Sequence, residues 1–197
     1  MAEPPLSTHG KGLKPLLAVL VLLCGGCSLV PGTDRNGFEV IEARLSHTGK
    51  LCLVDANLDH HFSSAVIEAL EQGVPLTLVR HFKLSRIRYF WLDEPLVSVS
   101  RSLHLSVHPK TRIYRIVYSD TGVVENFSSL TTLIEYLGSI RDWPITTPDH
   151  WHPDQTYQAS LRITLDIEAL PLPLRPIAYL SPDWHLESPR YLWRVAG

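Results

Sequence analysis

The stretch that decides the fold covers residues 63–94 and reads SSAVIEALEQGVPLTLVRHFKLSRIRYFWLDE. Its first part predicts a short helix, because a serine that can cap the N-terminus precedes three apolar residues at helical spacing, Val66, Ile67 and Leu70. Gly73 is expected to end this helix, since glycine adopts the left-handed conformation without steric cost. Pro75 then prevents helix continuation, and a strand is predicted to begin beside it and run through Phe82.

Alternating apolar and polar residues predict strands on both sides of this helix. Upstream, residues 38–45 and 51–58 are interpreted as a hairpin; downstream, residues 96–107 and 157–167 each place apolar residues on one face. Residues 128–138 repeat the serine cap, the apolar face and the glycine stop, so they predict a second helix. The turns between the strands are too short for parallel crossovers, which favours antiparallel pairing.

These elements predict a mainly β (α+β) fold, an antiparallel β-sandwich or bent sheet of six to eight strands with two short covering helices. Arg101 interrupts an apolar strand face and is expected at the rim with its guanidinium in water; the alternative is an inward position beside a carboxylate. Residues 170–176 contain three prolines and are expected to form a stiff, extended edge segment. Trp91 is expected to anchor a packed aromatic corner.

The N-terminal residues differ in kind from this domain. Two lysines precede an uninterrupted apolar run, residues 16–23, which is followed by the sequence CGGCS. A positive region, a short apolar core and then small residues is the order found in secretory signals. The predicted organisation is therefore an export segment or membrane anchor at residues 1–27, a linker at residues 28–37 and a single β-rich domain at residues 38–197.

Cys27 decides how the export segment is processed. A leucine-rich run and two glycines precede it, as in bacterial lipoproteins, whose acylated cysteine becomes the first residue; Cys24 stands where that pattern usually has leucine. A lipid anchor at Cys27, cleavage to a soluble protein and retention as a membrane anchor all stay open. In each case the chain is expected to be exported, either periplasmic or membrane-anchored and facing the periplasm.

The composition argues against nucleic-acid binding. A formal charge of −2 and an isoelectric point near 6.5 provide no basic field that would neutralise phosphates. Residues 80–91 do interleave arginines with aromatics, as single-strand grooves do. In an exported protein this stretch is interpreted as a solvated strand face, which could also lie against anionic lipid headgroups.

One cluster raises a metal hypothesis. His150 and His152 stand two residues apart, so an extended chain would hold them about 6–7 Å from each other, and Asp149 or Asp154 could complete a site. The competing interpretation is that these are solvated loop histidines. No H-E-x-x-H motif, G-x-S-x-G elbow or glycine-rich phosphate loop is present. We therefore expect no catalytic residues, no cofactor and no enzymatic activity.

Several motifs, taken in order, resemble an uncharacterised family of exported proteobacterial envelope proteins. The resemblance covers most of residues 38–193 and rests on ALEQGVPL at 69–76, the aromatic stretch at 86–93, Tyr114 with Tyr118, the helix at 127–137, and residues 162–166 followed by LPLPL at 170–174. The family is classed only as a domain of unknown function, so it supplies no catalytic residues. It implies an envelope protein whose gene often lies beside a sensor kinase and response regulator related to the nitrogen-regulation pair.

These observations favour a non-catalytic interaction module, exported and lipid-anchored or held by an uncleaved segment. Its expected partner is an envelope or membrane protein such as a sensor kinase, and not a nucleic acid. Two alternatives stay open: a metal-dependent hydrolase that uses His150 and His152, and a small-molecule or lipid-binding envelope protein.

Overall fold

The computed structural model describes residue 1 and residues 36–48, 51–88, 92–146, 151–152 and 154–197. These residues, apart from the first, belong to the compact unit Arg35–Gly197. The fold below is that of this unit.

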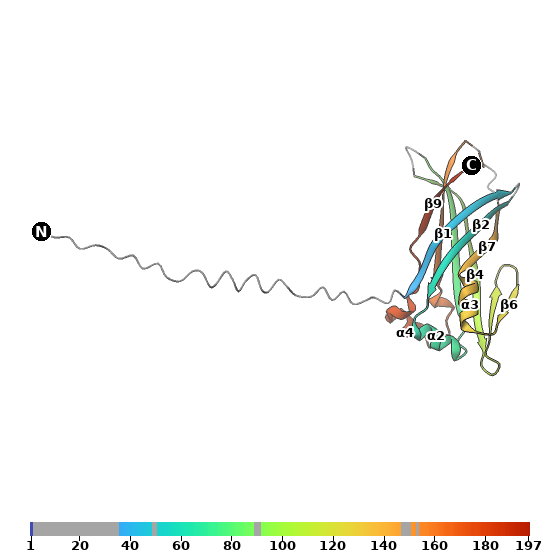
Figure 1. The fold of residues 1–197 in the computed structure, drawn as a ribbon, viewed down its shortest axis with the longest axis vertical. Helices are drawn as coiled ribbons and strands as arrows, with labels where there is room; N and C mark the ends of the chain where they lie inside the picture. Colours follow the sequence, from blue (N-terminus) through green and yellow to red (C-terminus); the bar gives the residue numbers. More distant parts are fainter. Residues whose placement is uncertain (2–35, 49–50, 89–91, 147–150, 153) are drawn as a thin grey trace. The chain divides into compact units, whose positions relative to one another are not determined.

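Two antiparallel sheets form the domain (Figure 1). The smaller sheet has the strand order β1-β2-β7, with β1 at Gly37–Thr48, β2 at Leu51–His61 and β7 at Ser139–Thr146. The larger has the order β6-β5-β4-β3-β8-β9, with β3 at Leu76–Arg86, β4 at Glu94–His108, β5 at Ile113–Tyr118, β6 at Val124–Phe127, β8 at Thr156–Leu165 and β9 at Tyr191–Ala196. The predicted mainly β, antiparallel architecture is confirmed.

Short helices cap the sheets. They are α2 at Ser64–Glu71, α3 at Leu130–Leu137 and α4 at Arg175–Leu180, with 3₁₀ turns η1 at Ile167–Ala169 and η2 at Pro182–Trp184. The side chain of Ser63 accepts a hydrogen bond from the N–H of Val66 and so caps α2, as the sequence predicts. Gly73 follows α2 with a φ of +91°, which is why glycine stands there.

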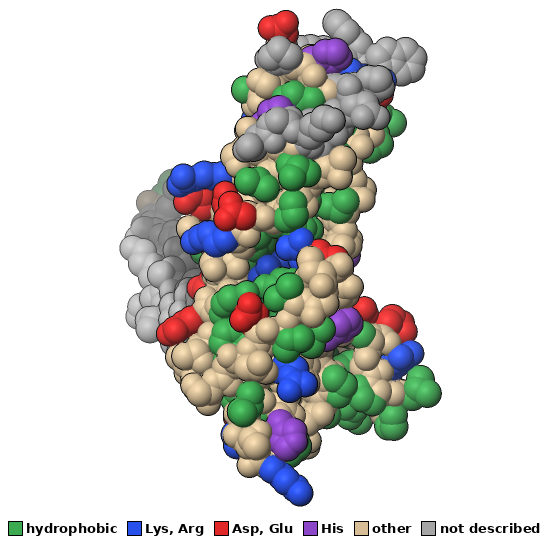
Figure 2. Space-filling view, turned by 90° about the vertical axis from the view of Figure 1, so that its right-hand side faces the viewer, with side chains coloured by type: hydrophobic (Ala, Val, Ile, Leu, Met, Phe, Trp, Pro, Cys, Tyr) green, Lys and Arg blue, Asp and Glu red, His purple; other side chains and the backbone are tan. Residues whose placement is uncertain are grey.

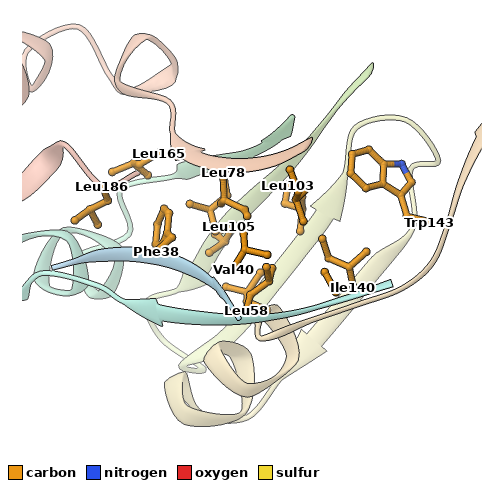
Figure 3. Close-up of a cluster of buried hydrophobic side chains, with 14 of the residues drawn as sticks. Phe38, Val40, Leu58, Leu78, Leu103, Leu105, Ile140, Trp143, Leu165 and Leu186 are labelled. Carbon is orange, nitrogen blue, oxygen red and sulfur yellow. The ribbon is translucent and has the colours of Figure 1, made fainter. Parts of the chain in front are cut away.

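The two sheets face each other across a common hydrophobic core. Figure 3 shows side chains of the smaller sheet, among them Phe38, Val40 and Leu58, pointing toward Leu78 and Leu105 of the larger one. The centre is closed by Phe82, which is fully buried and packs against Trp143 and Trp193. Interlocked side chains of this kind supply most of the free energy of folding.

Strand β7 is not among the predicted strands, and it contains Pro144. A proline donates no backbone hydrogen bond and is therefore confined to edges of sheets. Strand β7 is such an edge, since its only partner among the named strands is β2, where Pro144 lies opposite Leu53. With β6 and β9, this strand takes the described domain beyond the predicted six to eight.

The prediction of an extended segment at residues 170–176 was wrong from Leu172 onward, because residues 172–174 form a turn that leads into a helix. Residues 175–180 form α4, with Pro176 within its first turn. Proline is compatible with a helix there, because the N–H groups of the first turn have no partner within the helix. The expected corner around Trp91 lies outside the described residues.

Two arginines also differ from expectation. The side chain of Arg101 is only 12% exposed, and its Nε donates to Asp120 Oδ2 over 2.6 Å, so the inward alternative holds rather than the rim. Its guanidinium also lies 5.0 Å from the ring centre of Trp143. Arg80 is 3% exposed and points into the core, rather than to a solvated face.

The sandwich has two ends that differ in their connections. At the N-terminal end, β1 begins and α2, α4 and η2 lie together. Ser63 Oγ, at the start of α2, donates to the carbonyl of Asp183 in η2 over 2.7 Å. At the opposite end, β3 ends, β8 begins and β9 ends. We call this the arginine end, because Arg86 of β3 and Arg194 of β9 lie there. Strand β8 runs from the arginine end to the N-terminal end, a length of about 30 Å.

Candidate functional site

The structure describes half of the predicted metal-binding set. Asp149 and His150 lie outside the described residues, whereas His152 and Asp154 are exposed residues just before β8. In the part of the chain that is described, no group of three or more His, Cys, Asp or Glu side chains is placed to hold a metal ion. The metal hypothesis therefore stays a prediction. So does acylation of Cys27, which also lies outside the described residues.

One serine–histidine contact resembles part of a catalytic set. His81 Nδ1 lies 2.9 Å from Ser100 Oγ on the outer face of the larger sheet, and Nε2 lies 3.2 Å from Thr164 Oγ1. A nucleophile of the serine type needs a histidine oriented by a third group, usually a carboxylate. Here the second ring nitrogen meets a hydroxyl, so the contact ties three strands together without forming such a triad.

Arg80 has a structural explanation. Burial lowers its pKa to about 10, so the guanidinium is still charged at neutral pH. Its Nη2 donates to the carbonyl of Leu137 over 3.2 Å. Leu137 is the last residue of α3, where the helix dipole carries partial negative charge. Arg80 thus fastens α3 to the larger sheet and is not available to a ligand.

A polar pocket of about 270 Å³ opens on the smaller sheet. Its side chains satisfy one another: Arg141 Nη2 donates to Asn57 Oδ1 over 3.0 Å, and the N–H of Asp142 donates to Asp55 Oδ1 over 3.0 Å. The second bond holds Asp142 at a φ of +49°, where β2 and β7 shift register. These groups shape a bulge, and their hydrogen bonds are already used.

The arginine end offers a different arrangement. An open pocket of about 500 Å³ is lined by Arg86, Ile87, Arg88, Asp154, Gln155, Thr156 and Arg194. Neighbouring Glu94 forms ion pairs with both Arg86 and Arg88. Because two guanidiniums here already bind one carboxylate of the same chain, this surface is suited to carboxylate ligands.

Sheet register brings these residues together from three parts of the chain. The N–H of Ile87 donates to the carbonyl of Thr156 over 3.2 Å, which holds the end of β3 to the start of β8. The N–H of Gly197 donates to the carbonyl of Gln155 over 3.0 Å, which holds the end of β9 to the same place. Arg194 lies opposite Gln158 in this register.

The pocket favours an anion, because its three arginines outnumber two carboxylates, Asp154 in the lining and the neighbouring Glu94. The hydrogen bonds from Arg86, and then those from Arg88, lower the pKa of the Glu94 carboxyl. Arg86 Nη1 also donates to Gln155 Oε1 over 3.3 Å, which orients it. Arg194 is exposed and forms no ion pair with the described residues. Its guanidinium is therefore open to an incoming carboxylate.

Stacked aromatic rings lie at the same end. The ring of Trp151 is sandwiched between His47, at 5.4 Å, and Tyr157, at 4.4 Å, with nearly parallel planes. The Tyr157 ring is buried, and its hydroxyl accepts a hydrogen bond from the N–H of His152 over 2.8 Å. Trp, Tyr and Arg are the residues most enriched at the energetic centres of protein interfaces. A rigid aromatic platform beside arginines fits that use.

On the face that carries α3 and β6, acidic and basic side chains are interspersed with hydrophobic ones (Figure 2). The described residues contain no helix that is long and apolar enough to span a membrane.

A family model described as Domain of unknown function (DUF4390) matches residues 35–194. The chain belongs to this family. The matched range includes both ends of the sandwich and all three pocket arginines, so the arginine end is part of the family domain. No curated protein and no solved structure matches the chain.

Sequence reasoning found part of this pocket. The sequence shows Arg86 and Arg88 as part of one basic and aromatic stretch, but nothing in it indicates that Arg194 lies near them. The available signal was the alternation in YLWRVA, residues 191–196, which predicts a strand. Its pairing with β8, and hence the meeting of Arg194 with β3, depends on a tertiary register that local pattern does not determine.

Proposed function

We propose that this chain is an exported, non-catalytic interaction module of the bacterial envelope. Its N-terminal segment holds it at a membrane, and the arginine end binds an acidic segment of an envelope or membrane protein. The family resemblance favours a membrane sensor kinase as that partner. The observation that carries the proposal is the pocket in which Arg86 and Arg88 converge on one carboxylate while Arg194 is open.

The chemistry of the pocket supports an acidic peptide as its ligand. Guanidinium–carboxylate pairs form strong, directional hydrogen bonds, and Arg194 can supply one without losing an existing ion pair among the described residues. Both faces of the Trp151 ring are covered by the stack, but the residue is partly exposed, so its fixed edge can meet a ligand with little loss of side-chain entropy. Glu94 occupies Arg86 and Arg88, so a ligand that also engages these two must compete with it.

Crosslinking in intact cells, followed by pull-down and mass spectrometry, tests the proposal. The wild-type chain should recover one envelope or membrane protein whose sequence contains an acidic segment. The double variant Arg88→Glu with Arg194→Glu should recover at least about tenfold less, which corresponds to about 1.4 kcal/mol of binding free energy.

The matched control is Arg190→Glu, which reverses an exposed arginine outside the pocket. It should recover the partner at the wild-type level. Recovery of no envelope protein above background, or equal recovery by the double variant and the control, would overturn the proposal.

A further inference from the structure

The N-terminal end carries an exposed apolar surface on and just before α4. Leu180 is 87% exposed and Leu172 is 74% exposed, and Ile177 and Tyr179 are exposed as well. All four lie within nine consecutive residues, and they are called the α4 patch below. Contiguous exposed apolar side chains mark surfaces that meet a partner or a membrane.

The α4 patch is held on a built platform. Leu170 before it and Trp184 after it are buried in the core. Arg175 Nε donates to the carbonyl of Leu170 over 2.8 Å, which closes the turn that leads into the helix. Ala178 is the one buried residue of α4, so the helix lies flat on the domain with its larger apolar side chains outward. The exposure is therefore built into the fold.

The position of the α4 patch beside the start of β1 indicates which partner covers it. The N–H of Phe38, at the start of β1, approaches the carbonyl of Glu187 over 3.4 Å, a few residues beyond α4 and η2. Figure 1 shows the start of β1 and α4 at the same end of the domain. The chain therefore enters the domain beside the patch, and it enters from a sequence that contains the apolar run at residues 16–23.

Chain length limits how far this end can lie from an anchor. From Cys27 to Gly37 the chain spans at most about 36 Å when fully extended. A membrane anchor at or before Cys27 keeps the N-terminal end close to the bilayer. Docking of the patch is then intramolecular, so a surface too small to bind a membrane from solution can do so at a high effective concentration.

We propose that the α4 patch docks on the phospholipid bilayer to which the N-terminal segment is attached. Leu172, Ile177 and Leu180 enter the boundary between headgroups and acyl chains. Tyr179 and Arg175 suit the interface itself, since each has an apolar body and a polar tip. This inference rests on the membrane attachment in the proposed function, but not on the arginine pocket.

Docking through α4 would orient the whole domain. Strand β8 connects the two ends, so the arginine pocket would stand about 30 Å farther from the bilayer than the patch. That places the pocket where the extramembrane part of a membrane protein can reach it. A freely swinging domain would present the pocket in any direction.

Site-specific photocrosslinking of the full chain tests the inference. Benzoylphenylalanine replaces either Leu180 or Leu192, an equally hydrophobic residue of β9 that is 54% exposed. The protein is reconstituted in vesicles of phosphatidylethanolamine and phosphatidylglycerol, floated on a density gradient, irradiated and analysed by mass spectrometry. Position 180 should give about tenfold more lipid adducts than position 192. The Arg88→Glu, Arg194→Glu double variant should give the same ratio.

Each contrary result has a distinct meaning. Equal lipid adducts at positions 180 and 192 in a chain that floats would overturn docking and leave the attachment and the arginine pocket standing. Adducts at position 180 to protein instead of lipid would also overturn it, in favour of a second copy. A chain that does not float would overturn attachment and docking together. Both substituted residues are exposed, and thermal melts of the two proteins should agree.

Discussion

The two ends of the sandwich are built from the same strands but finish differently. At the arginine end, β3, β8 and β9 end in charged side chains around an open pocket, and Glu94 is half-exposed between its arginines. At the N-terminal end, His60 and Ser63 are buried, and α4 exposes apolar side chains. The contrast predicts that substitutions of the buried His60 and Ser63 reduce stability, whereas substitution of the exposed Arg194 reduces partner binding instead.

The largest effect on stability is expected from His60. Both ring nitrogens are buried without a hydrogen-bond partner among the described residues, and the ring packs against Phe38 and Phe62. Burial, and secondarily the charge of Arg80, lowers its pKa from 6.5 to about 3. Between these two values the unfolded chain binds a proton that the folded chain does not, so stability falls as the pH falls.

The consequence is measurable by urea unfolding at a series of pH values. Between pH 8 and pH 4 the wild type should lose about 3 kcal/mol more than His60→Leu, because the variant has no imidazole to protonate on unfolding. His61→Leu is the control: its ring is exposed and lies 3.2 Å from Asp59. If His60→Leu and wild type lose stability in parallel, His60 is not a buried neutral histidine.

A pair of helix caps should show a smaller effect. Ser63 and Ser129 both accept a hydrogen bond from the helix they precede, at 3.2 Å in each case. Ser63 is buried and Ser129 is not, and among the described residues only Ser63 also donates to another element, at the Asp183 carbonyl. Ser63→Ala should therefore cost about 2 kcal/mol and Ser129→Ala about 1 kcal/mol. Equal losses in urea unfolding would show that the link from α2 to η2 adds nothing.

Elements were predicted correctly from the sequence where their local pattern agrees with their position in the folded domain. The helix before Gly73, the strand after Pro75 and the alternation through Leu103 and Leu105 all follow from spacing, and the structure confirms each of them. Prolines caused the errors: Pro144 lies in an edge strand and Pro176 in the first turn of a helix, two positions where proline is tolerated.

The candidate site was less predictable than the fold. Arg101 was expected at the rim, because its Asp120 partner comes from a later turn that the strand pattern does not place. Similarly, Arg194 joins Arg86 and Arg88 only through the pairing of β9 with β8 and of β8 with β3. Registers between distant strands are settled by packing of the whole core, which no local window contains.

The smallest effect on stability is expected at the arginine end. Arg194 is exposed and forms no ion pair with the described residues, so its guanidinium gains little from folding. Arg194→Glu should change the free energy of unfolding by less than about 0.5 kcal/mol, as surface substitutions usually do. Urea unfolding at neutral pH, with Arg190→Glu beside it, measures this. A loss comparable to that of Ser63→Ala would mean that Arg194 supports the fold, and reduced partner recovery by its charge reversal could then reflect unfolding. With unchanged stability, the same reduced recovery must come from the binding surface itself.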